Sequence, residues 1–426
     1  MEPDNLKRVI LKYKELLPTE ILKRDVEILS SKLDKANVIV GPRRSGKTFF
    51  LYDIVKGKKS SPVLINFEDN LLVGLKREDL SKILDYSKEL FEGRLTFYFD
   101  EIQNVDKWEN FIITLLNEHY EVYITGSNSK LLSKEIASSL RGKSLSYLML
   151  PFSFSEFLRA KKITLEKNFE YTDKVYKVKK QFSIFMKYGG FPEIVFTNQT
   201  MLKNKLINNY FDTVLYKDLV DRLQIKNIKL LEITMNHMIN LFSNTFSIVA
   251  YENYLKSNKI PYSLENLYII LKSLQDVFLI GYVKKYSKSF KKMELSKSKI
   301  YLFDTGYIQF LSNEFKDYGR ILENIVFIEL FRRKGDIENK SIFYYKSKEE
   351  EECDFVVKNN NKIEVIQVTY EMNHKNRKRE IDGLLSAIKF FKLKEGTILT
   401  YDQEDEINIE KYKIKIKPIW KWLLEK

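Results

Sequence analysis

The sequence predicts an α/β protein that opens with a parallel β-sheet covered by helices on both faces. Within the first 150 residues, five short apolar runs alternate with stretches of helical periodicity. Each run is mostly apolar along its length, without strict alternation, which is typical of strands buried on both faces. Strands separated by helices indicate a parallel sheet. The predicted strands are Asn37–Val40, Val63–Phe67, Leu95–Phe99, Val122–Thr125 and Leu145–Leu150.

The chain of 426 residues is too long for one hydrophobic core. Domains usually contain about 100–200 residues, so several are expected. The α/β domain should begin with two amphipathic helices, Asn5–Leu17 and Glu20–Leu33, separated by Pro18. Helical patterns then continue from Pro151 to about residue 225. The expected domains are residues 1–150, 151–226, 227–315 and 316–426.

The third and fourth domains have different patterns. Residues 227–315 show three helices and then a lysine-rich hairpin, which is the order of a winged helix. The last of these helices is expected at Ser263–Ile280. In the fourth domain, helices and strands are mixed. The clearest elements there are helices at Arg320–Lys334 and Arg377–Phe391 and a strand at Gly396–Tyr401.

Composition excludes some classes of protein. No run approaches the roughly 18 apolar residues of a membrane helix, and the N-terminus does not resemble a signal peptide, so a cytoplasmic protein is expected, with no membrane partner. The single cysteine, Cys353, excludes an intrachain disulfide and a cysteine-rich zinc site. The net charge of +14 favours a polyanionic partner such as nucleic acid. A genome-wide bias toward lysine in its proteins would give the same charge without such a partner.

A glycine-rich segment after the first strand matches the phosphate-binding P-loop pattern G-x-x-x-x-G-K-[ST]. It lies between a strand and a helical run, as that motif requires. The glycines allow backbone N–H groups to surround phosphates, Lys47 reaches the β- and γ-phosphates, and the Thr48 hydroxyl binds Mg²⁺. The sequence therefore predicts a site for ATP and Mg²⁺. Its eight residues are Gly41, Pro42, Arg43, Arg44, Ser45, Gly46, Lys47 and Thr48.

Two carboxylates end the third predicted strand. Asp100 is expected to hold Mg²⁺ through water, and Glu101 to polarise the attacking water as a general base. Two solvated acids at the start of a loop are the alternative. Because a P-loop lies upstream, hydrolysis of ATP is the favoured interpretation.

Three further polar residues are candidates for sensing the γ-phosphate. Ser127 and Asn128 follow the strand expected beside Asp100, although they could instead cap the next helix. Arg141 is a candidate arginine finger, in its own chain or for a neighbouring subunit. A solvated surface arginine is the alternative.

Six motifs occur in the order found in one family of archaeal and bacterial AAA-type ATPases, which the chain resembles over nearly its whole length. The motifs are Gly41–Thr48, Phe99–Gln103, Ile124–Ser129, Leu140–Gly142, Pro151–Phe157 and Gly189–Glu193. The resemblance implies an ATPase core, a helical lid, a winged helix and a C-terminal domain similar to restriction endonucleases. The role of that last domain is unknown in the family.

The resemblance also implies where a nuclease site would lie, and this chain departs from it. Glu323 matches the family's helical acid, and Asp354 matches the first strand acid. Where the family pattern has glutamate and lysine two residues apart on the next strand, this chain has Gln367 and Thr369. Glu364 cannot replace the lost acid, because its odd offset from Gln367 places it on the opposite face of the strand. We expect that cleavage is lost and that the pocket is a relic.

The expected wing carries lysines that could contact phosphates without reading sequence. They are Lys284, Lys285, Lys288, Lys291 and Lys292. A solvated hairpin in a lysine-rich protein is the alternative.

Three functions remain open from the sequence. The favoured one is Mg²⁺-ATP hydrolysis that rearranges the winged-helix and nuclease-like domains on DNA. The second is an ATP-gated switch that binds a protein partner without DNA. The third is an ATP-dependent nuclease, which the residues Gln367 and Thr369 oppose.

Overall fold

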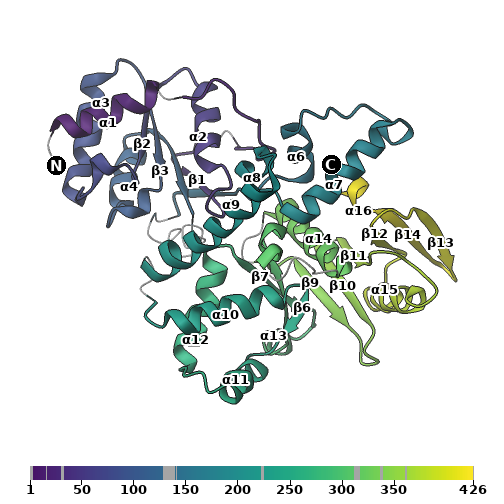
Figure 1. Cartoon of the computed structure of the whole chain (residues 1–426). Coiled ribbons are helices and arrows are strands. Elements are labelled where there is room, and N and C mark those ends of the chain that lie inside the picture. The colour runs from purple at the N-terminus through teal and green to yellow at the C-terminus, as the bar shows by residue number, and fades with distance from the viewer. Residues whose placement is uncertain are drawn as a thin grey trace. The chain divides into compact units, whose positions relative to one another are not determined.

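The computed structural model describes residues 3–15, 17–29, 33–127, 140, 142–221, 225–310, 317–335, 339–359 and 362–425. The chain forms two compact units, Met1–Leu150 and Pro151–Lys426 (Figure 1). Each unit is described by itself. Within the described residues, no helix is both long and apolar enough to cross a membrane.

The first unit contains a five-stranded sheet in the order β2-β3-β4-β1-β5. All of its strand pairs are parallel, which confirms the predicted parallel sheet. The strands are β1 (Ala36–Val40), β2 (Ser61–Asn66), β3 (Leu95–Asp100), β4 (Glu121–Gly126) and β5 (Ser144–Leu148). The helices are α1 (Pro3–Glu15), α2 (Lys47–Lys56), α3 (Leu80–Leu90) and α4 (Glu109–Asn117).

One predicted helix of this unit is wrong. Glu20–Leu33 was expected to be helical, but none of its described residues lies in a helix. Burial alternates with period two here, with Arg24 buried and Val26 and Ile28 partly buried against the core, as in an extended segment. The apolar residues fit both periodicities, and packing on the sheet selects the extended one.

The second unit begins with helices and contains one long sheet. The helices before the sheet's main strands are α6 (Phe154–Ala160), α7 (Lys174–Tyr188), α8 (Pro192–Phe196), α9 (Thr200–Asp212), which continues as a π-helix over Thr213–Asp221, α10 (Ile228–Asn240), α11 (Ile248–Ser257) and α12 (Leu264–Asp276). The helix expected at Ser263–Ile280 is therefore shorter. It ends because Phe278 has a positive φ of 57°, after which Ile280 begins a strand.

The sheet of the second unit has nine strands in the order β13-β14-β12-β11-β10-β9-β7-β8-β6. β7 pairs in parallel with β9, so the expected wing hairpin and the C-terminal strands share one sheet. The strands are β6 (Asn244–Phe246), β7 (Ile280–Lys285), β8 (Ser298–Leu302), β9 (Ile342–Lys346), β10 (Glu352–Asn359), β11 (Lys362–Val368), β12 (Glu395–Thr400), β13 (Asp405–Ile409) and β14 (Tyr412–Pro418).

Four helices accompany these strands: α13 (Phe290–Glu294), α14 (Tyr318–Lys334), α15 (Arg377–Phe391) and α16 (Ile419–Trp422). The two helices and the strand predicted in the C-terminal part are present at α14, α15 and β12. α15 packs on β10, β11 and β12, as seen on the right of Figure 1.

A buried carboxylate joins several turns of the second unit. Asp304 accepts hydrogen bonds from the N–H groups of Gly190 and Gly306, both at 2.8 Å. Gly189 has φ 72°, and a Cβ there would lie 1.7 Å from an Asp304 oxygen. The N–H of Phe152 donates to Gly190 at 2.8 Å. Two motifs that carried the family resemblance therefore meet in one hydrogen-bonded cluster.

Candidate functional site

The loop between β1 and α2 has the backbone turns of a phosphate-binding loop. Gly46 has φ 95°, and the exposed Arg44 has φ 64°. Gly41 passes so close to the end of β5 that a Cβ would lie 1.9 Å from the carbonyl oxygen of Met149. The Met149 N–H donates to Val40 at 2.7 Å. Gly41 is thus required by packing as well as by the turn.

The side chains of this loop leave groups that phosphate oxygens can use. Lys47 is buried, and its Nζ donates to the carbonyls of Gly41 at 3.1 Å and Pro42 at 2.8 Å. The Ser45 hydroxyl is buried and has no hydrogen-bond partner among the described residues. An unpaired buried hydroxyl is uncommon, and a ligand oxygen would satisfy it.

Two arginines make polar contacts in and around the P-loop. Arg24 donates to the carbonyls of Ser45 and Leu150, both at 2.7 Å. It lies in the segment that the sequence predicted as helix, and its role was missed for that reason. Arg43 is half-buried and pairs with Glu68 at 3.1 Å.

Asp100 lies where the ends of β3 and β4 meet the start of α2. The Thr48 hydroxyl donates to Asp100 Oδ2 at 2.7 Å, and the Thr125 hydroxyl donates to Oδ1. Thr125 is the register partner of Asp100 in β4, which lies between β3 and β1. Burial, together with the charge of Glu101, raises the pKa of Asp100 to about 6. Nearby positive charge would stabilise this carboxylate.

Glu101 is buried beside Asp100 in an uncommon backbone conformation. Its φ is 54°, a value that is costly for a residue other than glycine and that clusters at functional sites. The Ser127 hydroxyl donates to Glu101 Oε2 at 3.2 Å, and the Gln103 amide donates to the same oxygen. These contacts fix the direction of the carboxylate. Gln103 was part of a family motif but had no predicted role.

The residues present fit Mg²⁺ and a nucleotide. Thr48 and Asp100 offer two oxygens 2.7 Å apart, and Mg²⁺ prefers hard oxygen ligands and retained waters. Lys47 and the N-terminus of α2 supply positive charge for phosphates. Of the sensor candidates, only Ser127 lies in the described part of the chain. Asn128 and Arg141 lie outside the described residues.

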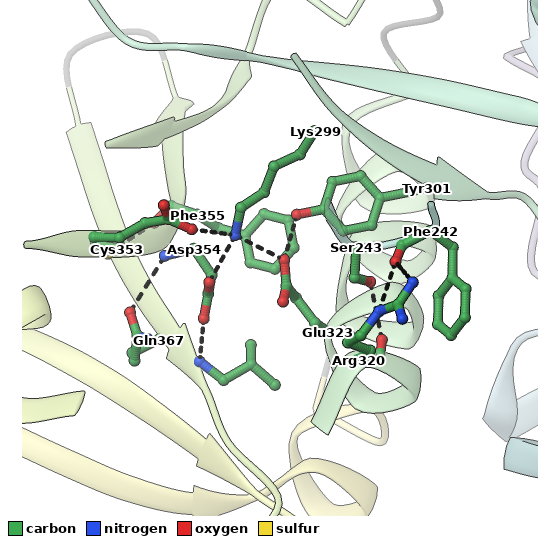
Figure 2. A network of polar contacts seen from close by, with 12 residues as sticks. Phe242, Ser243, Lys299, Tyr301, Arg320, Glu323, Cys353, Asp354, Phe355 and Gln367 are labelled. Carbon is green, nitrogen blue, oxygen red and sulfur yellow. Dashed lines mark hydrogen bonds and ion pairs between the residues drawn. The ribbon is translucent and has the colours of Figure 1, made fainter. Parts of the chain in front are cut away.

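A second cluster of charged side chains lies in the C-terminal unit (Figure 2). Lys299 from β8 is buried, and its Nζ lies 3.0 Å from Glu323 of α14, 2.9 Å from Asp354 and 2.7 Å from Glu352 of β10. The Tyr301 hydroxyl donates to Glu323 at 2.6 Å. We call these five residues the Lys299 cluster.

The residues predicted from the nuclease resemblance lie in or beside this cluster. Asp354 Oδ2 accepts the N–H of Val368 at 2.9 Å, and the Asp354 N–H donates to Gln367 at 3.2 Å. The Gln367 amide donates to Glu380 of α15 at 2.8 Å. Thr369 instead donates to a backbone carbonyl two residues on, at 3.2 Å. Glu323, Asp354 and Gln367 are thus brought together, whereas Thr369 is engaged elsewhere.

Lys299 was not predicted to belong to this cluster. In the sequence it follows the lysines of the expected wing, but it is only 3% exposed. Burial alone would lower the pKa of Lys299, but Asp354 and then Glu323 outweigh burial and raise it well above its ordinary value. Burial raises the pKa of Glu323 to about 7. The lysine is therefore a permanent cation among these acids.

The five lysines predicted for the wing differ in their surroundings. Lys284 pairs with Glu294 at 2.6 Å, and Lys288 lies over the ring of Phe390. Lys285 is half-buried. The two on α13, Lys291 and Lys292, are exposed.

Comparisons with known proteins match three families along the chain. An AAA domain matches residues 33–158, a domain of unknown function (DUF8612) matches residues 179–318, and another (DUF4143) matches residues 318–422. Among solved structures, the chain is similar to the STAND protein PH0952 from Pyrococcus horikoshii, with 14% identity, 76% of this chain and 50% of that chain covered, and a TM-score of 0.26. The Drosophila ORC bound to AT-rich DNA and Cdc6 has 10% identity, 72% and 91% coverage, and a TM-score of 0.20.

Two relatives extend over almost the whole chain. An uncharacterized protein of Haemophilus influenzae is 28% identical over 88% of this chain and 92% of its own length. The uncharacterized protein MJ1544 of Methanocaldococcus jannaschii is 40% identical over 95% of this chain and 91% of its own length. The chain therefore belongs to the same family as MJ1544, with an AAA domain at its N-terminal end.

Proposed function

We propose that this protein is a Mg²⁺-dependent ATPase whose turnover moves its second unit on nucleic acid. The observation that carries the proposal is the pair of hydrogen bonds that join Thr48 of the P-loop and Thr125 of β4 to Asp100. Three elements that are far apart in sequence thereby place a lysine, a hydroxyl and two carboxylates at one edge of the sheet. In open α/β sheets this edge is where ligands bind.

Each residue of the site has a distinct task in the proposed reaction. Lys47 exchanges its two loop carbonyls for the β- and γ-phosphates. Thr48 and Asp100 would hold Mg²⁺, which would supply positive charge beside the phosphates. Glu101 accepts a proton from the attacking water, and Ser127 keeps its carboxylate oriented.

Ser127 is also the proposed start of signal transmission. It follows β4 and contacts the general base, so loss of the γ-phosphate would change its hydrogen bonds. We propose Asn128 and Arg141 as further sensors. The expected winged-helix and nuclease-like parts share one continuous sheet. We therefore propose that these two parts move together.

Nucleic acid is the proposed partner because of the exposed lysines on and near α13. Lys288, Lys291 and Lys292 are exposed, and lysines bind phosphates as point charges without reading bases. Lys284 is already paired with Glu294 and should contribute less.

The experiment measures ATP turnover by the full chain, with and without duplex DNA at low salt. Lys47→Ala should lose both nucleotide binding and turnover. Glu101→Gln should bind a fluorescent ATP analogue normally but turn over ATP at least about a hundredfold more slowly, the lower end of the usual range for a lost general base. Equal turnover by wild type and Glu101→Gln would refute the assigned base.

The DNA arm needs a variant pair matched in charge. Lys291→Gln with Lys292→Gln should weaken DNA binding and stimulation at low salt, and the difference from wild type should shrink as salt rises. The control is Lys177→Gln with Lys180→Gln, which removes two exposed lysines from α7 and should change neither. If DNA stimulates neither the wild-type chain nor the control variant, the assignment of nucleic acid as partner fails. An ATP-gated switch that binds a protein then becomes the better account.

A further inference from the structure

The Lys299 cluster has the geometry of an occupied cation site. The ammonium donates to Glu323 and Asp354 and pairs with Glu352, at distances of 2.7–3.0 Å. An ammonium group has three N–H donors, and three carboxylates surround this one. The three acids come from α14 and β10, so the cation joins two elements to its own strand, β8 (Figure 2).

A metal ion does not fit these residues as they lie. The restriction-endonuclease resemblance implies Mg²⁺ on the first strand acid, Asp354, close to the helical acid Glu323, with oxygen ligands at about 2.0–2.1 Å. Lys299 Nζ lies within 3.0 Å of an oxygen from each of these two acids, so the ammonium fills the space between them. Within the described part of the chain, no group of three or more acidic, histidine or cysteine side chains is arranged to hold a metal ion.

The structure also keeps the lysine from leaving. Its backbone is paired on both sides, with Val283 of β7 and Thr245 of β6. The side chain is 4% exposed, so water does not solvate its charge. Moving the ammonium away would leave three carboxylates facing one another, two of them deeply buried.

Tyr301 strengthens this arrangement from the same strand. It lies two residues after Lys299 and therefore shares its face of β8. Its hydroxyl donates to Glu323, and its ring stacks on Phe327 of α14 with centroids 4.6 Å apart. The face of β8 that meets α14 thus supplies both a cation and a hydrogen-bond donor to the acids.

We propose that Lys299 takes the place of a divalent metal ion in the nuclease-like pocket. The chain fills the acidic site with its own ammonium, so the pocket binds no metal and cleaves no phosphodiester. Its role is instead to fix β8 to α14 and β10. The inference does not depend on ATP hydrolysis and goes beyond it.

The test measures Mn²⁺ binding to the full chain in the absence of nucleotide, with electron paramagnetic resonance as the readout. Lys299→Met keeps most of the length of the side chain and removes its charge. It should bind one more Mn²⁺ ion per chain than wild type, and Mn²⁺ should raise its melting temperature. Adding Asp354→Asn should abolish the extra ion. Lys297→Met, which removes an exposed lysine two residues earlier, should behave as wild type.

Two outcomes would overturn the proposal. One is a folded Lys299→Met chain, with wild-type affinity for ATP, that takes up no additional Mn²⁺. The other outcome is measured on wild type and on Asp354→Asn, both of which keep Lys299. Wild type and Asp354→Asn should bind equal amounts of Mn²⁺, and neither should cut DNA. A loss of Mn²⁺ uptake or of Mg²⁺-dependent DNA cleavage in Asp354→Asn would refute the proposal even if Lys299→Met does not fold.

Discussion

Replacing Asp304 by asparagine should change how the stability of the second unit depends on pH. Burial raises the pKa of Asp304 from 3.8 to about 7, although two backbone N–H groups and Arg332 oppose the rise. The folded protein thus holds this proton more tightly than the unfolded chain does. The resulting stabilisation is complete below pH 3.8 and is lost as the pH rises through about 7.

The structure sets the size of the effect. The difference between pKa values of 3.8 and about 7 corresponds to about 4 kcal/mol in total. Between pH 5.5 and 7.5, roughly half of it, about 2 kcal/mol, should be lost from the free energy of unfolding. Asparagine cannot titrate. It also loses one of the two hydrogen bonds from Gly190 and Gly306, but that cost is the same at every pH.

The assay uses the chain's tryptophans to observe the second unit alone. Trp108 lies in the first unit, whereas Trp420 and Trp422 lie in the second. In a Trp108→Phe background, urea unfolding at the two pH values therefore reports on the second unit. The midpoint should fall by about 0.7 M more for Asp304 than for the asparagine variant, if the slope is near 3 kcal/mol per M. Other titrating groups are common to both chains and cancel. Parallel midpoints in the two chains would refute a proton held by Asp304.

Three further substitutions test other contacts. Gly41→Ala would place a Cβ 1.9 Å from the Met149 oxygen, so it should destabilise the first unit by about 3 kcal/mol and abolish binding of a fluorescent ATP analogue. Thr125→Val removes a hydrogen bond to the proposed metal ligand Asp100 and should lower ATP turnover about 10- to 100-fold, with activity largely kept in Thr125→Ser; an unchanged rate would show that the bond does not matter. Gly383→Ala would place a Cβ 2.2 Å from a backbone oxygen of β10 and should lower the melting temperature of the second unit, while a normal affinity for ATP shows that the first unit is intact.

Local sequence was sufficient for the first unit's sheet and for the candidate residues that meet at the carboxyl ends of its strands. Each of the five strands is a short, mostly apolar run, and the P-loop lies within eight successive residues, so neither depends on distant parts of the chain. Asp100 could be placed because parallel strands bring their carboxyl ends to one edge. Gln103 and Arg24 could not be assigned roles, since what they contact is set by the folded loop.

Errors arose where two periodicities fit the same residues. Arg24, Val26 and Ile28 are spaced for an extended chain, but the surrounding apolar residues also suit a helix. The choice depends on what the segment packs against, and the sequence alone does not contain that surface. The pairing of β7 with β9 is a similar case, because a hairpin with alternating residues does not reveal that a third strand will join its edge.

Lys299 shows that a count of charges does not reveal which charged side chains are exposed. It lies within a lysine-rich stretch, and Lys291 and Lys292 of that stretch are exposed. Strand alternation predicts that Lys299 and Tyr301 share a face of β8, and that Ile300 takes the other. What that face meets is an acidic pair from α14 and β10, 24 and 55 residues further along the chain. The acids therefore contact a cation from β8, and the sequence alone does not reveal this contact. One side chain of β8 thus joins its strand to α14 and β10, and Lys299→Met tests whether these acids would hold a metal ion without it.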